Sequence, residues 1–172
     1  MKIFNKTILV LMTVLAVSLT GCSKDDDGGE DPQGGTGTFK AKVDGDNFTG
    51  IEGTVMAVSS AEGSSFTVSG GTMESENLQI VITQGFDGVG TYDLGLMNIG
   101  TYSYLPDPNN PDPSTVVIYS TVGNQSAGEL RVSSYDGSVA KGTFSFNAAN
   151  LDNPNETVSV TSGEFNIEVT EQ

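Results

Sequence analysis

The residue best suited to covalent chemistry is Cys22, the only cysteine in this chain of 172 residues. A thiol becomes a strong nucleophile once it is deprotonated, and Leu19, Thr20 and Gly21 directly precede it. The small residues among them let the chain enter the narrow site of a protease in an extended conformation. The position of Cys22 after an apolar stretch indicates lipid attachment, which would tether the mature protein to a membrane by its first residue.

Several side chains that enzymes commonly use are absent. There is no histidine, which excludes Ser-His-Asp hydrolysis, histidine-ligated zinc and imidazole acid–base catalysis. A lipidated Cys22 excludes thiol catalysis, thiolate metal sites and disulfides. There is also no tryptophan for stacking on sugars or cations. Paired carboxylates or bound calcium remain open, but no motif requires them. We expect no enzymatic activity, no metal site and no cofactor.

The segment before Cys22 has the layout of a secretory signal peptide. Lys2 and Lys6 make its start positive, and residues 8–17 are apolar except for Thr13. This run is shorter than the roughly 18 apolar residues that a membrane-spanning helix needs. We therefore expect residues 1–21 to be a cleaved signal peptide. There are two alternatives: an ordinary cleaved signal that leaves Cys22 with a free thiol, or an uncleaved anchor.

The four residues Leu19, Thr20, Gly21 and Cys22 resemble the lipobox of bacterial lipoproteins at every position. The resemblance implies that the thiol of Cys22 takes a diacylglycerol and that the signal is cut between Gly21 and Cys22. It also implies acylation of the new amino terminus. Two or more acyl chains hold a protein firmly in a bilayer, whereas a single chain holds it only marginally.

Residues 22–37 are expected to form a flexible tether. After Cys22 this stretch holds five carboxylates and five glycines and no apolar side chain. Such a composition cannot offset the conformational entropy lost on folding. The fifteen residues that follow Cys22 reach at most about 50 Å when fully extended.

The start of this tether also resembles the lipoprotein export signal of Bacteroidota. The residues concerned are Ser23, Lys24, Asp25, Asp26 and Asp27. The resemblance implies a lipid-anchored protein on the outer face of the outer membrane. The alternative is that the three aspartates are a solvated spacer and that the protein faces the periplasm.

The charge balance narrows the choice of partners. The chain has 7 Lys+Arg and 22 Asp+Glu; removing Lys2 and Lys6 with the signal leaves 5 cationic and 22 acidic side chains, a net charge of −17. Such a surface repels phosphate backbones, so nucleic acid is excluded as a partner. We expect contact with the membrane through the lipid, and a glycan or protein partner at the cell surface.

Residues 38–172 alternate apolar and polar positions almost throughout, with glycine, Asp and Asn at the breaks. This pattern predicts one all-β domain, an antiparallel β-sandwich or flattened barrel of about ten strands. A bulge or a bend is expected at Gly50 and Gly53, and a bulge at Ser162 and Gly163. The predicted strands are residues 38–43, 48–58, 65–69, 77–83, 91–94, 99–105, 115–121, 129–135, 139–148 and 156–170.

The alternation also predicts which side chains face the core. Phe144 and Phe146 should point inward from one strand, and Phe165, Ile167 and Val169 from another. Their neighbours should then face the opposite side, namely Ser145, Asn166 and Glu168. Residues 115–121 are apolar enough to form a central strand.

Three parts of this domain resemble a domain-of-unknown-function family of Bacteroidota lipoproteins. They are residues 39–45, residues 90–94, and residues 142–146 together with residues 162–165. The matching residues are those of strands and turns. The resemblance implies an all-β lipoprotein and brings no catalytic residues with it.

The longest irregular segment is the proline-rich stretch of residues 104–113. It is a candidate binding loop for a glycan or a cation because its oxygens and flanking tyrosines lie on a β scaffold. The alternative is a stiff crossover between strands. The candidate residues are Tyr104, Asp107, Asn109, Asn110, Asp112 and Tyr119.

Asp44, Gly45 and Asp46 suggest calcium at first sight. However, the twelfth position counted from Asp44 is Val55, where a calcium loop needs an acidic ligand. A hairpin turn is the better interpretation. The sequence as a whole therefore predicts a surface lipoprotein that acts as a non-enzymatic binding or structural module. The alternative is a carbohydrate-directed role, as a glycan-binding accessory protein or a carboxylate-based hydrolase.

Overall fold

The computed structural model describes residues 34–60, 64–124 and 127–172. The predicted signal peptide, Cys22 and the export segment lie outside the described residues. The described part contains eleven strands and one short 3-10 helix, η1. The strands are β1 (Thr38–Val43), β2 (Asp46–Thr49), β3 (Met56–Ser59), β4 (Phe66–Gly71), β5 (Glu76–Ile82), β6 (Gly90–Leu94), β7 (Ile99–Tyr104), β8 (Val117–Ser120), β9 (Gly128–Tyr135), β10 (Val139–Asn150) and β11 (Thr157–Glu171), and η1 is Pro113–Thr115.

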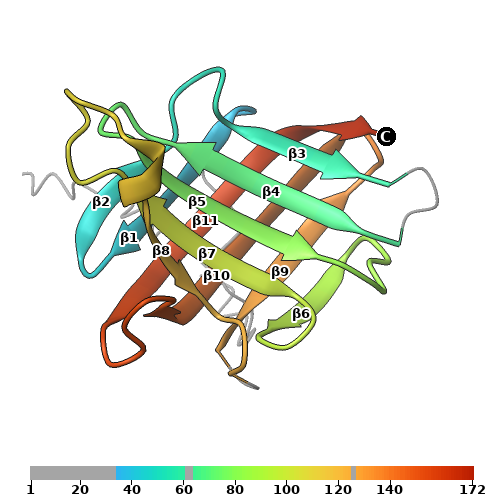
Figure 1. The fold of residues 1–172 in the computed structure, drawn as a ribbon. Coiled ribbons are helices and arrows are strands. Elements are labelled where there is room, and N and C mark those ends of the chain that lie inside the picture. Colours follow the sequence, from blue (N-terminus) through green and yellow to red (C-terminus); the bar gives the residue numbers. More distant parts are fainter. Residues whose placement is uncertain (1–33, 61–63, 125–126) are drawn as a thin grey trace, which may run out of the picture.

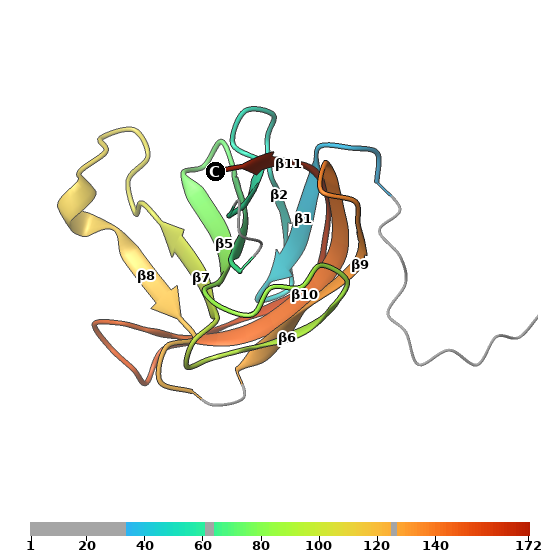
Figure 2. The same cartoon turned by 90° about the vertical axis from the view of Figure 1, so that its right-hand side faces the viewer.

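The strands form two layers that face each other (Figure 1). One layer has the order β2-β1-β11-β10-β9-β6, and the other has the order β3-β4-β5-β7-β8. The layers join at two corners, where the end of β11 pairs with β3 and the end of β10 pairs with β8. These two junctions close a ring, which Figure 2 shows from the side. The prediction of an all-β sandwich or flattened barrel is confirmed.

The core lies between the layers and follows the predicted alternation. The side chains of Phe39, Phe66, Phe146 and Phe165 are 2% exposed or less. Aromatic rings pack between the two layers. The ring centroid of Phe66 in the five-stranded layer lies 6.4 Å from that of Phe165 in the six-stranded layer. Period-two alternation is sufficient to fill this space, since each strand turns every second side chain inward.

Two local predictions are confirmed by the backbone. Asp44 and Gly45 have φ angles of 50° and 95°, and they connect Val43 to Asp46, which pair across β1 and β2. This is a two-residue hairpin of the type that needs positive φ at both central positions. The expected bulge in β11 is also present, because Ser162 has a φ of 51° and the register with both neighbouring strands shifts around it.

The predicted strand of residues 48–58 is wrong as a single element. It divides into β2 and β3 at residues 50–55 because the chain crosses there from one layer to the other. The amide of Gly50 still donates to the carbonyl of Phe39 in the first layer, whereas Ile51 donates to Gly71 in the second. The crossing raises the strand count from about ten to eleven. It also places β3 parallel to β11, so the sheet is mixed rather than wholly antiparallel.

The expectation of a central strand at residues 115–121 holds only in part. The strand is shorter, from Val117 to Ser120, and pairs with β7 on one side. On its other side it has only two paired positions with β10. Ile118 is 38% exposed, because this corner of the sandwich is open.

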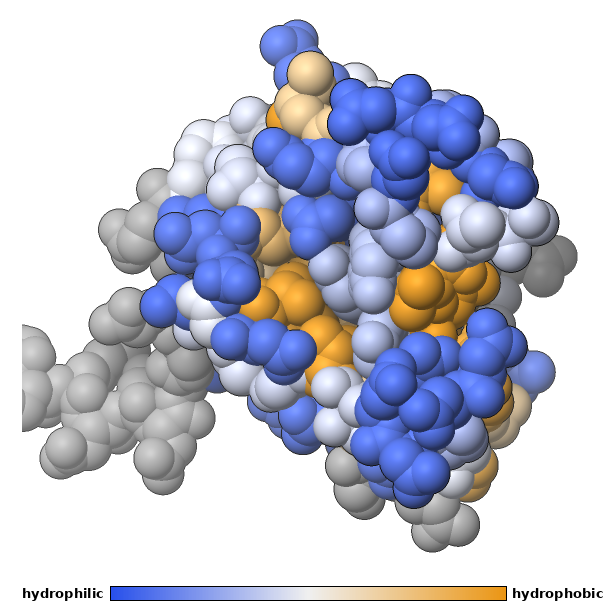
Figure 3. All heavy atoms as spheres, turned by 60° about the vertical axis from the view of Figure 1, so that its left-hand side comes forward, coloured by the Kyte–Doolittle hydropathy of each residue, from blue (hydrophilic) through white to orange (hydrophobic). Residues whose placement is uncertain are grey.

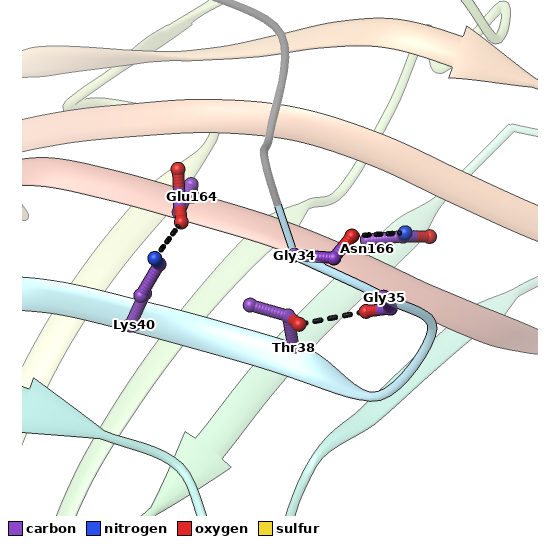
Figure 4. A network of polar contacts seen from close by, with 6 residues as sticks. All are labelled: Gly34, Gly35, Thr38, Lys40, Glu164 and Asn166. Carbon is purple, nitrogen blue, oxygen red and sulfur yellow. Dashed lines mark hydrogen bonds and ion pairs between the residues drawn. The ribbon is translucent and has the colours of Figure 1, made fainter.

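The outward position of Asn166 was predicted, but its side chain is only 4% exposed. Residues 34–37 run over β11 at this point (Figure 4). The Asn166 side-chain amide donates to the carbonyl of Gly34 at 2.8 Å, and the amide of Gly37 donates to the carbonyl of Asn166 at 2.7 Å. Alternation along one strand cannot show that another segment of the chain covers its outer face.

Candidate functional site

The clearest candidate site is a hollow of about 250 Å³ where the two layers open beside β8. We call it the mouth. Figure 3 brings this side of the molecule forward and shows hydrophobic side chains recessed between rims of hydrophilic ones. The β1–β2 hairpin contributes Val43, Asp44, Asp46, Asn47 and Phe48 to its lining. The facing strands contribute Glu76, Tyr102, Tyr104 and Tyr119, and β11 contributes Val158.

Three tyrosines gather in the mouth because of strand geometry. Tyr102 and Tyr104 are two positions apart on β7 and so share a face. Tyr119 on β8 is the register partner of Tyr102. The ring centroid of Tyr102 lies 5.9 Å from that of Tyr104 and 6.1 Å from that of Tyr119. Tyr102 is buried, while Tyr104 and Tyr119 are half-buried and reach the opening.

The carboxylate of Glu76 is held beside these rings by two hydroxyl groups. Tyr102 Oη donates to Glu76 Oε1 at 2.6 Å, and Thr72 Oγ1 donates to Glu76 Oε2 at 3.1 Å. Among the described residues, no lysine or arginine forms an ion pair with Glu76. The described ion pair joins Lys40 to Glu164 on the outer face of the six-stranded layer. Burial, followed by the hydrogen bond to Glu76 and its negative charge, raises the pKa of Tyr102 above its usual value.

The raised pKa of Tyr102 predicts a loss of stability in alkali. The folded state keeps the phenol proton, whereas the unfolded chain releases it near pH 10. The contribution is therefore fully present below about pH 10 and is lost as the pH rises further. Urea unfolding of the wild type and Tyr102→Phe should be measured between about pH 9 and 11. The free energy of unfolding should fall more steeply with pH in the wild type than in the variant. Parallel declines would contradict the assignment.

The structure separates the residues of the predicted binding loop into two groups. Tyr104 and Tyr119 line the mouth, but none of the loop's Asp and Asn residues does. Asp107 Oδ1 accepts the backbone amides of Asn109 and Asn110. Asp112 caps η1 by accepting from the amide and hydroxyl of Ser114, and these hydrogen bonds lower its pKa. The two aspartates of the loop thus stabilise the loop itself.

A second hollow, of about 330 Å³, adjoins the mouth on the side of the proline loop. It shares Glu76, Tyr102 and Tyr104 with the mouth and adds Glu74, Leu105, Pro106 and Pro108. The loop therefore contributes apolar surface to the site rather than oxygen ligands. A group bound in the mouth can extend over Tyr104 towards the prolines.

Sequence reasoning did not place Glu76, Tyr102 or the hairpin residues in a site. Asp44 and Asp46 were assigned to a turn, in which Asp44 does lie while Asp46 begins β2, and Tyr102 was assigned to a strand. No signal in the sequence joins residues 44–48 to Glu76 and Tyr102, because their proximity depends on how the layers face each other. The part of the chain that the structure describes contains no group of three or more His, Cys, Asp or Glu side chains able to hold a metal.

A larger hollow, of about 360 Å³, lies on the outer face of the six-stranded layer above the β11 bulge. Its lining is mostly short polar side chains and Gly163, with Phe144 as the aromatic residue. One of its two carboxylates, Glu164, is already paired with Lys40 (Figure 4). It offers fewer groups for recognition than the mouth does.

In the described ranges, no helix is long and apolar enough to cross a membrane. No curated protein and no solved structure matches the chain. A family model described as a domain of unknown function, DUF6252, matches residues 35–167. The match begins where the chain docks on β11 and ends within that strand, so it covers both layers and every residue of the mouth. The predicted resemblance to a domain-of-unknown-function family is confirmed: the chain belongs to the DUF6252 family.

Proposed function

We propose that this protein is a lipid-anchored, non-enzymatic binding module that holds its ligand in the mouth. The observation that carries the proposal is the convergence of three tyrosines and a carboxylate from one layer on the β1–β2 hairpin of the other. Aromatic rings with a few oriented polar groups are the usual lining of a small-molecule site.

The hydrogen bonds of Glu76 favour binding over catalysis. Each of its two oxygens accepts a hydroxyl hydrogen bond from within the protein, which holds the carboxylate in one position. The chain has no histidine to act as a partner in proton transfer. A volume of about 250 Å³ is slightly smaller than the usual ligand pocket of about 300–1,000 Å³, so the mouth suits a very small molecule or the end of a longer one.

A carbohydrate is the second candidate ligand. Tyrosine rings can pack on the apolar face of a sugar, and Asn47 with the carboxylates of the mouth can accept or donate hydrogen bonds to its hydroxyls. The adjoining hollow over Tyr104 leaves room for a further unit of a glycan. If the ligand is a carbohydrate, the protein would act as a glycan-binding accessory protein beside an uptake system.

The course of the chain fits an anchor on the side away from the mouth. Residues 34–37 lie against β11 next to Thr38, the first residue of β1. The hairpin that lines the mouth follows Val43, the last residue of β1, about 17 Å further along the strand. With Cys22 in the outer membrane, the domain would lie at the cell exterior if residues 23–27 act as an export signal.

Binding at the mouth is testable with the full-length protein in a non-ionic detergent. A glycan array and a library of small polar molecules should yield ligands whose affinity falls at least about tenfold in Tyr104→Ala. Leu96→Ala is the control, because Leu96 is exposed in the β6–β7 connection and should bind as the wild type does. Ligands that bind equally well to both variants would place the site elsewhere.

A further inference from the structure

Carboxylates line the mouth as well as the outer surface, whereas the cations of the described ranges lie only on the outside. The mouth is lined by Asp44, Asp46 and Glu76 and by no lysine or arginine. The cationic residues in the described ranges are Lys40, Lys42, Arg131 and Lys141. Each alternates with buried neighbours on β1, β9 or β10 and so points to the outer face of the six-stranded layer. The carboxylates of the mouth therefore face a hollow without a counter-charge from these strands.

The tyrosines make this hollow more specific than a cluster of acids alone. The face of an aromatic ring is negative, and a cation within about 6 Å of the ring centroid is attracted to it. Tyr102 lies between Tyr104 and Tyr119, with interplanar angles of 36° and 37°. Three neighbouring rings that line a hollow of about 250 Å³ offer negative aromatic faces of the kind that bind quaternary ammonium groups in aromatic cages.

Glu76 gives the hollow a fixed negative charge next to the rings. Its two hydroxyl donors, Tyr102 and Thr72, are neutral, so they orient the carboxylate without cancelling its charge. Asp44 is fixed as well, since its Oδ1 accepts the amide of Ser159 at 2.8 Å. The site is thus prepared before a ligand arrives, and a neutral ligand would leave its charge uncompensated.

We propose that the mouth binds an organic ammonium group, with the cation against the tyrosine rings and its charge balanced by Glu76 and Asp46. The inference rests on the proposed function, because it names the ligand class of the same site. A neutral sugar can use the donors of Asn47 and the tyrosine hydroxyls, but it leaves the negative charge of the lining without a counter-charge. The small volume suits a compact head group such as trimethylammonium, with the rest of the ligand lying over Tyr104.

The test uses choline and 3,3-dimethyl-1-butanol, which has the same shape with carbon in place of the ammonium nitrogen. The chain has 5 tyrosines and no tryptophan, so the intrinsic fluorescence of the full-length protein in non-ionic detergent reports on the tyrosines directly. Choline should bind at least about tenfold more tightly than the neutral analogue, and added salt should weaken it.

Two isosteric variants and one control complete the experiment. Glu76→Gln and Asp46→Asn each remove one charge from the mouth and should weaken choline binding at least about fivefold. Asp46 is exposed on the edge strand β2, so its replacement keeps the fold even if that of Glu76 does not. Asp93→Asn removes the same charge from an exposed position on β6 and should bind choline as the wild type does.

Equal affinity for choline and its neutral analogue, or no choline binding at about 10 mM, would overturn the inference. If a neutral sugar then binds and is lost in Tyr104→Ala, the proposed binding function stands and only the ligand class is wrong. A further contrary outcome is that Asp93→Asn weakens choline binding as much as Glu76→Gln does. In that case choline is attracted by the whole acidic surface and not by the mouth, and the inference fails as well.

Discussion

Replacing Phe146 with alanine should lower the free energy of unfolding by about 3–5 kcal/mol, a large part of the stability of a domain this size. Phe146 is 2% exposed and lies on β10 in the six-stranded layer. Its ring reaches β7 in the other layer, where a Cβ on Gly100 would lie only 2.9 Å from it. Truncation would therefore leave a cavity between the layers that neither backbone can close.

The matched control for this change is Ser145→Ala on the same strand. Ser145 is half-buried on the outer side, and its replacement should alter stability by about 0.5 kcal/mol or less. Urea denaturation of residues 34–172, which include the segment docked on β11, measures both changes. Equal losses for the two variants would show that β10 does not turn Phe146 into a shared core.

Replacing Cys22 with alanine should abolish partitioning of the protein into a detergent phase. Each buried methylene contributes about 0.8 kcal/mol, so several acyl chains bind a membrane almost irreversibly, whereas an acidic surface is repelled by anionic head groups. Without the thiol there is no site for the diacylglycerol, and the precursor should stay uncleaved or be released. Phase separation followed by electrophoresis measures both the partitioning and the size of the product.

Ser23→Ala is the control for that experiment, because it alters the next residue and leaves the thiol in place. It should partition as the wild type does and show the size of the mature protein. Detergent partitioning that persists in Cys22→Ala would mean that the protein is held by its signal segment or by another part of the chain. In that case the lipoprotein proposal would be wrong.

Much of the fold was predictable because it depends on neighbours in sequence. The inward faces of β1, β10 and β11 follow from alternation alone, since a strand turns each successive side chain to the other side. The turn at Asp44 and Gly45 was predictable for a similar reason, as both residue types tolerate positive φ. The bulge at Ser162 follows from the shift of the apolar pattern along one strand.

The errors arose where a segment changes layers or is covered by another. Residues 50–55 leave one layer for the other, which divides a continuous apolar pattern into β2 and β3. Asn166 is buried because residues 34–37 cross its strand. Ile118 is exposed because the ring is barely closed beside β8. None of these features depends on the period of the local sequence.

The sequence by itself determined that this chain is all-β, acidic and without histidine, whereas lipid attachment at Cys22 stays a prediction. These properties are composition and local pattern, which act within a few residues. Only the tertiary structure decided the site. It brought Asp46 at the start of β2, the carboxylate of Glu76 and the rings of Tyr102, Tyr104 and Tyr119 to one hollow. Long-range strand order and the closure of two layers set that proximity, and a one-dimensional pattern carries no distance between residues so far apart in sequence.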